Sequence, residues 1–180
     1  MEEKNSIIRI ALIGPESTAK SALSEALAKH FNTVWVPEYS RNYLSSINRK
    51  YNLDDIILIA KEQLKQENEL IKNANKFIFA DTELIISKVW CLDVFNVYPE
   101  FISDNLVKNK YDLYLLTCPD LPFVKDVLRE NPHRRDFFFD WYLKEINNIN
   151  GKYFIVNGVG EERLNNCVEA INNFTTSLRK

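Results

Sequence analysis

The chain begins with an apolar segment, a glycine-led turn and an amphipathic segment, and this succession limits the fold more than any other feature. Residues 7–13 (IIRIALI) predict a buried strand, and residues 21–30 predict a helix. Between them, residues 14–21 (GPESTAKS) form a turn of the phosphate-binding type, which needs a strand before it and a helix after it. The opening of the chain therefore predicts an α/β fold built around a nucleotide-binding loop.

Three positions of this loop match the pattern G-x-x-x-x-G-K-[ST], namely Gly14, Lys20 and Ser21. Backbone N–H groups of such a loop point inward and, with the positive N-terminal end of the following helix, attract nucleotide phosphates. Lys20 would reach the β- and γ-phosphates, and the Ser21 hydroxyl would hold Mg²⁺. We therefore expect ATP and Mg²⁺ as cofactors. The residues expected to bind the nucleotide are Gly14, Ser17, Thr18, Ala19, Lys20, Ser21 and Ala22.

Ala19 departs from the pattern, which has its second glycine there. If the φ angle of Ala19 is positive, its Cβ costs about 1–2 kcal/mol. The methyl group also crowds the approach of a phosphate, which glycine leaves open. The sequence thus predicts weakened but measurable ATP binding that Ala19→Gly improves. The alternative without a ligand is a polar turn with a capping serine and a surface lysine, but the flanking strand and helix favour phosphate binding.

From the composition of the chain we expect a cytoplasmic protein with a single domain that spans residues 1–180. Hydrophobic residues make up 46% of the chain and charged residues 27%, which is ordinary for a globular domain. The net charge of −2 gives no general attraction to nucleic acid or to a membrane, and no apolar run approaches the roughly 20 residues of a membrane span. The N-terminus lacks a signal-peptide pattern. Cys91, Cys118 and Cys167 are widely spaced and predict reduced core thiols.

Strands and helices alternate along the rest of the chain. Apolar segments predict further strands at residues 33–36, 76–81, 112–117 and 153–156, and helices at residues 53–74 and 161–178. We expect Asp54 to cap the first of these helices. Its core-facing residues are expected to be Ile57, Ala60, Leu64 and Ile71. Near-continuous apolar strands separated by helices predict a parallel sheet covered on both faces, with ligands bound at the rim formed by its strand ends.

Three polar residues follow directly after predicted strands and are candidates for the rim. Asp81 would orient Mg²⁺ or hold an acceptor hydroxyl, although it could also cap the next helix. Glu38 could accept a proton from an acceptor hydroxyl. Arg41, one helical turn further on, could bind a phosphate or pair with Glu38, and a surface ion pair is the alternative.

Residues 127–136 are too charged and proline-broken to belong to the core. Such a segment between helical stretches could close over a nucleotide as a short helical lid, and its arginines could stabilise charge in phosphoryl transfer. Of Arg129, Arg134 and Arg135, we expect Arg129 and Arg135 to act on phosphate. A solvated helix–turn–helix is the alternative.

Three aromatic residues near the rim, Trp35, Trp90 and Phe95, could stack a planar base, and each could equally be core.

Together these elements resemble the ribosylnicotinamide kinase domain of NadR-type proteins, within the P-loop kinases related to AAA-type ATPases. The matching segments, in family order, are residues 14–21 (GPESTAKS), 37–41 (PEYSR), 79–83 (FADTE), 128–135 (LRENPHRR) and 157–163 (NGVGEER). The resemblance implies a P-loop NTPase fold with a five-stranded parallel sheet, Mg·ATP as phosphoryl donor, and a nucleoside such as nicotinamide riboside as acceptor at its 5′-hydroxyl. It also implies that Asn157 and Gly158 lie beside adenine.

The sequence departs from the family pattern at Ala19 and also where the family places aromatic partners for the nicotinamide ring. Pro37 follows the second strand, and only the neighbouring Trp35 is aromatic; Phe95 is the candidate beyond Asp81. Met1 lies just before the first strand, so we expect the chain to carry neither the DNA-binding nor the adenylyltransferase portion of longer family members.

The leading interpretation is an ATP-dependent nucleoside kinase. Lys20 and the lid arginines would neutralise the transferring phosphoryl group, while Glu38 or Asp81 positions the acceptor. A nucleotide-binding sensor that has lost turnover is the alternative, and Ala19 favours it. A GTPase is disfavoured because residues 75–78 (NKFI) lack the aspartate that reads guanine, and a large AAA⁺ machine because the chain has no room for a helical lid domain. Simple nucleoside-monophosphate and sugar kinases stay open.

Overall fold

The computed structural model describes residues 6–178 of the chain. Its elements, in order, are β1 (Ile8–Ile13), α1 (Lys20–His30), β2 (Val34–Val36), α2 (Tyr39–Ser46), α3 (Leu53–Leu70), a 3₁₀ turn (Ile71–Asn73), β3 (Phe77–Asp81), α4 (Leu84–Phe95), α5 (Glu100–Lys108), β4 (Leu113–Thr117), α6 (Arg135–Asn148), β5 (Tyr153–Val156) and α7 (Glu161–Ser177).

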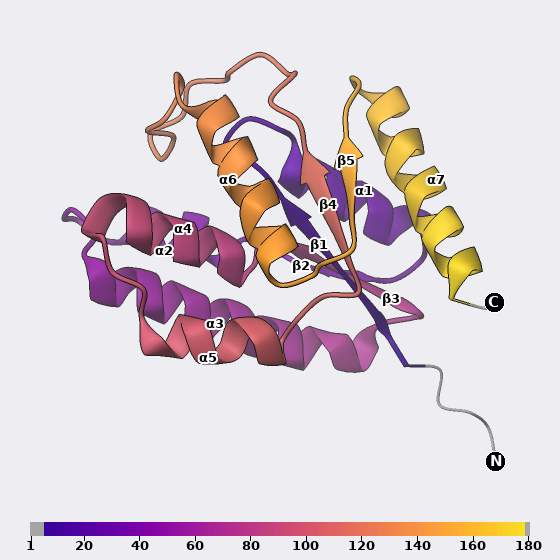
Figure 1. Cartoon of the computed structure of the whole chain (residues 1–180), viewed down its shortest axis with the longest axis horizontal. Helices are drawn as coiled ribbons and strands as arrows, with labels where there is room; N and C mark the ends of the chain where they lie inside the picture. The colour runs from indigo at the N-terminus through magenta and orange to yellow at the C-terminus, as the bar shows by residue number, and fades with distance from the viewer. Residues whose placement is uncertain (1–5, 179–180) are drawn as a thin grey trace.

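All five strands run parallel in the order β2-β3-β1-β4-β5, as Figure 1 shows. The predicted parallel sheet is confirmed. The first strand lies at its centre, with β3 on one side and β4 on the other. The connection after β1 runs to β2 at one edge of the sheet, whereas the connection after β4 runs to β5 at the other edge, and open α/β sheets bind ligands at the crevice formed by such a switch point. The loop of residues 14–21 leaves the sheet at this point.

Alternating residues of the central strand face two separate cores. Ile10 and Leu12 belong to the cluster shared with α1 and α7, whereas Ala11 and Ile13 belong to the cluster shared with α3, α4, α5 and α6. In Figure 1 the sheet accordingly lies between two helical layers. Both faces of the sheet are thus covered, as the near-continuous apolar strands predict.

The long helix α3 differs in detail from the prediction. Asn52, rather than Asp54, is its N-cap: the Asn52 side chain accepts the Asp55 N–H, and the Asp55 side chain accepts the Asn52 N–H in return. Such a capping box satisfies two backbone donors that helix formation leaves free. The face turned to the core is also rotated from the predicted one. Its buried residues are Asp55, Ile56, Ile59, Ala60, Gln63 and Glu67.

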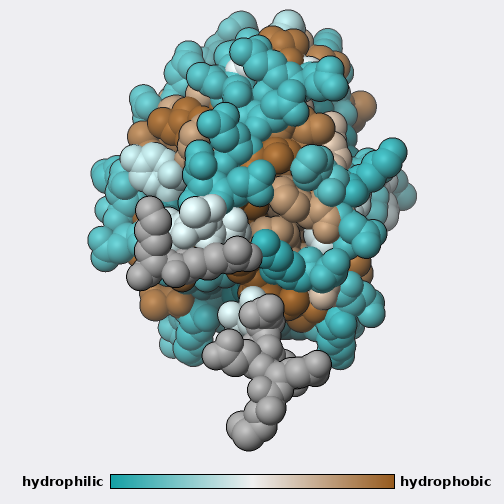
Figure 2. Space-filling view, turned by 90° about the vertical axis from the view of Figure 1, so that its right-hand side faces the viewer, coloured by the Kyte–Doolittle hydropathy of each residue, from teal (hydrophilic) through white to brown (hydrophobic). Residues whose placement is uncertain are grey.

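One edge of the sheet is more exposed than the predicted buried strands suggest. Figure 2 views the molecule from the right-hand side of Figure 1 and shows a mostly hydrophilic surface broken by apolar patches. The edge strand β5 leaves Tyr153, Phe154 and Ile155 between 37% and 40% exposed, since only β4 pairs with it. Within residues 6–178, no helix has the length and apolarity needed to cross a membrane.

Candidate active site

The first turn of the phosphate-binding loop fits only glycine. Gly14 has a φ of +152°, and a Cβ built on it would lie 2.2 Å from Thr117 Oγ1 and 2.7 Å from the Thr117 carbonyl oxygen. No heavy-atom contact of that length is tolerated, and the carbonyl cannot move away without disturbing β4. The loop therefore lies directly against the end of β4.

Ala19 adopts the conformation that the missing glycine would favour. It is the N-cap of α1, with a φ of 65° and a ψ of 22°, which is left-handed backbone. Ser17 also has a positive φ, 57°. The loop thus keeps positive φ angles without its second glycine. Because the φ of Ala19 is positive, this residue carries the backbone strain that the sequence predicts in that case.

A cavity of about 1000 Å³ opens over this loop. One part of its wall is formed by residues 14–22 and by Glu38 and Arg41 at the start of α2. The opposite part is largely apolar and aromatic, and is formed by side chains of the segment before α3 and of α4 and α6. These include Ile47, Tyr51, Val89, Trp90, Phe95 and Phe138. One continuous space therefore joins the loop to an aromatic compartment.

Lys20 lies within this cavity among acidic groups. Its Nζ donates a hydrogen bond to the Pro15 carbonyl at 2.8 Å. Burial lowers the pKa of the Lys20 ammonium, and the nearby Glu38, Asp81 and Glu16 act in the opposite direction. A phosphate anion bound here would favour the charged ammonium, because an opposite charge nearby stabilises the ionised form.

Asp81 is a fully buried carboxylate at the end of β3. Among the described residues, neither of its oxygens has a hydrogen-bond partner. Burial, helped by the charge of Glu38, raises the pKa of Asp81 to about 6. The alternative role as a helix cap is wrong, because Glu83 caps α4 and accepts the Ile85 N–H at 2.9 Å. An unpartnered carboxylate is a group that a divalent cation would satisfy, so Asp81 and the Ser21 hydroxyl fit the expected Mg²⁺.

Glu38 and Arg41 both line the cavity, but they do not pair with each other as one sequence alternative had it. Glu38 is the N-cap of α2 and accepts a hydrogen bond from Ser40 Oγ at 2.6 Å. Arg41 instead donates to Asp126 at 2.9 Å, and this bond raises the pKa of Arg41. The Glu38 carboxylate thus keeps acceptor capacity for another group.

The segment between β4 and α6 covers one side of the loop. Residues 118–134, all of which are described, contain turns but no helix, so the lid is helical only from Arg135 onward. Two loop side chains hold it. Glu16 accepts the N–H groups of Glu130 and Asn131, each at 3.1 Å, and Ser17 Oγ contacts the backbone of Val124.

The lid arginines have different partners. Arg129 lines the cavity and donates to the Val124 carbonyl at 2.6 Å. Arg135 also lines the cavity, but its guanidinium donates to the carbonyls of Leu121 and Pro119. Arg134 pairs with Asp93 of α4. Arg129 is therefore the lid arginine with the fewest competing contacts.

The aromatic candidates separate into two groups. Trp90 and Phe95 of α4 line the cavity and pack edge-on against Tyr51, with ring centroids 5.0 Å and 6.4 Å away. Trp35 does not line it: this side chain packs against the cluster on the opposite face of the sheet, while Val34 and Val36 face the near one. The expectation that Trp35 contacts substrate is therefore corrected. The sequence missed Tyr51, which follows no predicted strand.

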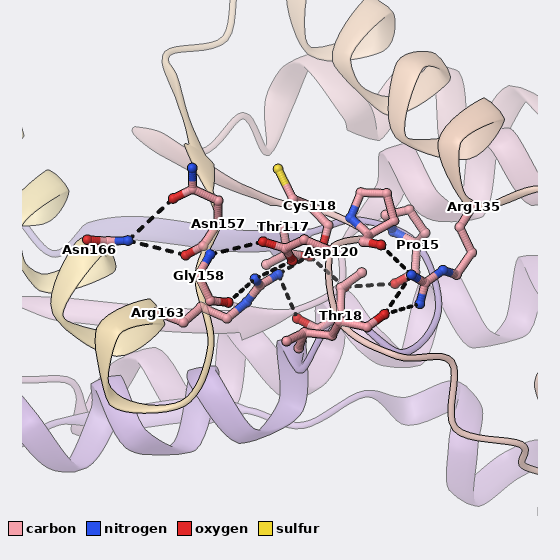
Figure 3. A network of polar contacts seen from close by, with 12 residues as sticks. Pro15, Thr18, Thr117, Cys118, Asp120, Arg135, Asn157, Gly158, Arg163 and Asn166 are labelled. Atoms are coloured by element: carbon pink, nitrogen blue, oxygen red, sulfur yellow. Dashed lines mark hydrogen bonds and ion pairs between the residues drawn. The ribbon is translucent and has the colours of Figure 1, made fainter.

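Asn157 and Gly158, expected beside adenine, lie outside the cavity wall in a polar network that also reaches Thr18 of the loop (Figure 3). The Gly158 N–H donates to Asp120 Oδ2 at 2.9 Å, and Asn166 donates to the side chain and carbonyl of Asn157. Arg163 of α7, which had no role assigned from the sequence, joins this network to the phosphate-binding loop.

Comparison with known proteins agrees with this geometry. The family described as "AAA domain" matches residues 9–163. The trifunctional NAD biosynthesis/regulator protein NadR of Escherichia coli (strain K12) is 31% identical over 126 residues, which cover 67% of this chain and 30% of that protein. NadR of Salmonella typhimurium is 30% identical over 124 residues with the same coverage. The matched region thus spans less than a third of these curated relatives.

Solved structures share the fold at lower identity. A crystal structure of NadR in complex with NR has a TM-score of 0.76 and 21% identity, covering 94% of this chain and 52% of that one. Thymidylate kinase from Candida albicans has a TM-score of 0.66 at 15% identity, covering 96% and 92% of the two chains. Deoxyadenosine kinase from M. mycoides has a TM-score of 0.60, also at 15%, covering 92% and 100%.

Because the AAA domain match runs from the central strand into α7, the chain belongs to that family of P-loop proteins, and it shares its fold with NadR and with P-loop nucleoside kinases.

Proposed function

We propose that this protein is an ATP-dependent kinase that transfers a phosphoryl group to a hydroxyl of a small nucleoside. One observation supports this above others: a single cavity is lined both by the phosphate-binding loop with Lys20 and by an aromatic compartment with Trp90 and Phe95. A cavity of about 1000 Å³ lies at the upper end of the range for small-molecule sites, about 300–1,000 Å³, and so has room for two ligands whose sites lie near the lower end. Kinases need such an arrangement because catalysis of phosphoryl transfer rests on positioning and charge neutralisation.

In this proposal the phosphate-binding loop binds the phosphoryl donor, ATP. Its backbone amides and the Lys20 ammonium would hold the β- and γ-phosphates, and Arg129 would add positive charge from the lid. Arg135 would join only after releasing the carbonyls that it now holds. Ser21 and Asp81 would hold Mg²⁺, which when bound neutralises charge on the phosphates.

In this proposal Glu38 acts on the hydroxyl group that accepts the phosphoryl group. Its carboxylate lines the same cavity as Lys20 and has acceptor capacity beyond the hydrogen bond from Ser40. It would orient the acceptor hydroxyl and take its proton as the new bond to phosphorus forms. The buried Asp81 lies near both groups, since the charge of Glu38 raises the pKa of Asp81 and the charge of Lys20 lowers it.

The charges around the acceptor compartment favour an uncharged or cationic nucleoside over a nucleoside monophosphate. Three arginines of the cavity wall are already paired with a carboxylate, and Arg135 is held by backbone carbonyls. The pairs are Arg41 with Asp126, Arg49 with Asp55 and Arg134 with Asp93. A phosphate on the acceptor would have to compete with these carboxylates. Nicotinamide riboside, with its cationic ring, fits this balance, and a NadR structure contains NR.

A nucleotide-binding sensor without turnover is the second candidate. The left-handed Ala19 favours it, because this residue lines the cavity at the position where the family pattern has glycine. Lys20, held by the Pro15 carbonyl, would also have to exchange that bond for a phosphate.

Mass spectrometry of reactions with ATP and Mg²⁺ separates these candidates. The panel contains nicotinamide riboside, the common nucleosides and the corresponding monophosphates, with Lys20→Met as the inactive control. A phosphorylated nucleoside that depends on Lys20 supports the kinase. Binding of ATP without any product from the panel supports the sensor, and phosphorylation of monophosphates alone contradicts the proposed acceptor. A cytoplasmic location and the absence of nucleic-acid or membrane partners stay predictions from the sequence.

A further inference from the structure

The guanidinium of Arg163 is buried behind the phosphate-binding loop. Arg163 lies in the first turn of α7 and is 1% exposed. Its Nη1 donates to Asp120 Oδ1 at 2.6 Å and to the Gly158 carbonyl at 2.8 Å, and its Nη2 donates to the carbonyls of Cys118 at 2.9 Å and Thr18 at 3.3 Å. Figure 3 shows these contacts converging on the one side chain.

The contact with Thr18 fixes the orientation of one peptide group in the loop. In a trans peptide the C=O and N–H bonds point in opposite directions, so the Ala19 N–H points away from Arg163 when the Thr18 C=O points toward it. Thr18 and Ala19 line the cavity, whereas Arg163 does not. Among the described residues, no group accepts a hydrogen bond from the Ala19 N–H. This amide is therefore turned away from the buried arginine and is free for an anion.

Ala19 needs such support more than glycine would. Left-handed backbone costs a non-glycine residue about 1–2 kcal/mol, and strained conformations persist only where the surroundings determine them. The methyl side chain of Ala19 makes no capping hydrogen bond to α1 that could offset this cost. The hydrogen bond from Arg163 acts on the peptide group that precedes Ala19; at 3.3 Å it is the longest of the four, and its donor carries a charge.

We propose that Arg163 is a positioning residue for the phosphate-binding loop: by holding the Thr18 carbonyl, it keeps Ala19 left-handed and its amide directed to the nucleotide, replacing the conformational preference of the missing glycine. Its consequence for nucleotide binding rests on the proposed function. Because the same guanidinium holds the Gly158 carbonyl, it also ties the loop after β5 to the phosphate-binding loop.

A double-mutant cycle between positions 163 and 19 tests this role. The four proteins are the wild type, Arg163→Met, Ala19→Gly and the double variant. We expect Arg163→Met to weaken AMP-PNP binding about tenfold in the wild-type background and at most about threefold in the Ala19→Gly background, within the range of coupling between neighbouring residues. A purely structural role for Arg163 predicts equal losses in both, and equal losses overturn the proposal.

Two further variants guard against general destabilisation. Arg163→Lys keeps a buried charge near Asp120 but cannot reach as many carbonyls, so its loss should be intermediate and should also shrink with Ala19→Gly. Arg9→Met is the matched control, because Arg9 pairs with the buried Glu67 and does not line the cavity. Its effect should be the same in the wild-type and the Ala19→Gly backgrounds. A similar coupling for Arg9 would overturn the assignment.

The same cycle measured as free energy of unfolding in urea, without nucleotide, separates this proposal from the proposed function. Coupling between Arg163 and Ala19 there supports the positioning role even in a protein that fails to bind AMP-PNP. Absence of AMP-PNP binding in the wild type contradicts the proposed function instead. Additive effects on unfolding overturn the positioning role whatever the nucleotide does.

Discussion

The hydroxyls of Thr18 and Thr117 lie 2.6 Å apart, so a buried hydrogen bond joins the phosphate-binding loop to the end of β4. Thr117 is also the residue against which Gly14 packs. The loop, the central strand and its neighbour therefore form one closely packed unit, and the shape of the loop depends on its packing against the end of β4.

Gly14→Ala should destabilise the protein by about 3 kcal/mol, since it forces backbone apart in addition to straining φ. Gly160→Ala is the matched control: its φ is +57°, but a Cβ there has no atom within 4 Å. Its ψ of −123° lies outside the left-handed helical region, so Gly160→Ala should cost on the order of 1–3 kcal/mol from backbone strain alone, and Gly14→Ala should exceed that loss by the cost of its clash. Urea unfolding of both variants measures the difference, and equal losses would show that the contact with Thr117 is unimportant.

Ala19→Gly should tighten binding of AMP-PNP about three- to tenfold, because it removes both the left-handed strain and the methyl group in the cavity wall. Isothermal titration calorimetry gives the dissociation constants. Ala22→Gly, at the other end of the loop and within α1, should not improve binding and serves as the control. Unchanged or weaker binding by Ala19→Gly would contradict the account of this position.

The buried Asp81 should make stability depend on pH. Its pKa is about 6 in the folded protein against an ordinary 3.8, so its contribution is fully present below pH 3.8 and is lost as the pH rises through 6. Asp81→Asn removes this loss and should stabilise the protein at pH 7.5 by up to about 3 kcal/mol, with a smaller gain at pH 5.

Burial raises the pKa of Glu83 to about 8, so its contribution to stability is lost at higher pH in the wild type and in Asp81→Asn alike. Only the difference in the free energy of unfolding between these two proteins therefore reports on Asp81. Urea unfolding at the two pH values provides it. A difference that does not change with pH would mean that Asp81 titrates normally.

Glu16→Gln should loosen the lid. A carboxylate accepts both N–H groups of residues 130 and 131, whereas an amide offers only one acceptor oxygen. Trypsin cleavage after Lys125 or Arg129 should become about tenfold faster, the equivalent of losing one hydrogen bond to a charged group. Glu25→Gln on the exposed face of α1 should leave cleavage unchanged. Equal cleavage of the two variants would show that Glu16 does not hold the lid.

Glu38→Gln should lower kcat about 100-fold if this carboxylate accepts the proton of the acceptor hydroxyl. AMP-PNP affinity should stay unchanged, because the donor phosphates are held by the loop. Ser40→Ala removes only the hydrogen bond to Glu38 and should have a much smaller effect on kcat. A large change in nucleotide affinity with kcat intact would assign Glu38 to the donor side instead.

Local patterns predicted most of the framework. The strands, the phosphate-binding loop and the rim position of Glu38, Arg41 and Asp81 follow from apolar periodicity and from motif spacing. Trp35 was misplaced because nearness to the end of a strand does not say which face a side chain takes, and successive residues of β2 alternate between the two.

The supporting contacts could not be predicted from such patterns, because they join side chains to backbone groups that are far apart in the sequence. Glu16 contacts the N–H of a residue 114 positions away, and Arg163 contacts a carbonyl 145 positions away. Nearly every residue type offers the same backbone N–H and C=O groups, so the sequence does not mark which of them will be a partner. Only the folded structure identifies these partners. The Asn52 cap of α3 was hidden for a simpler reason, since Asn52, Asp54 and Asp55 are all suitable capping residues.

The uncompensated carboxylate of Asp81 has a consequence for how long each copy of the molecule survives. Under the proposed function, a cation and nucleotide that satisfy it would bind only the folded chain and would shift the folding equilibrium toward it, while an empty copy would open more often and meet proteases more often. The abundance of this protein in a cell would then follow the supply of its own ligands.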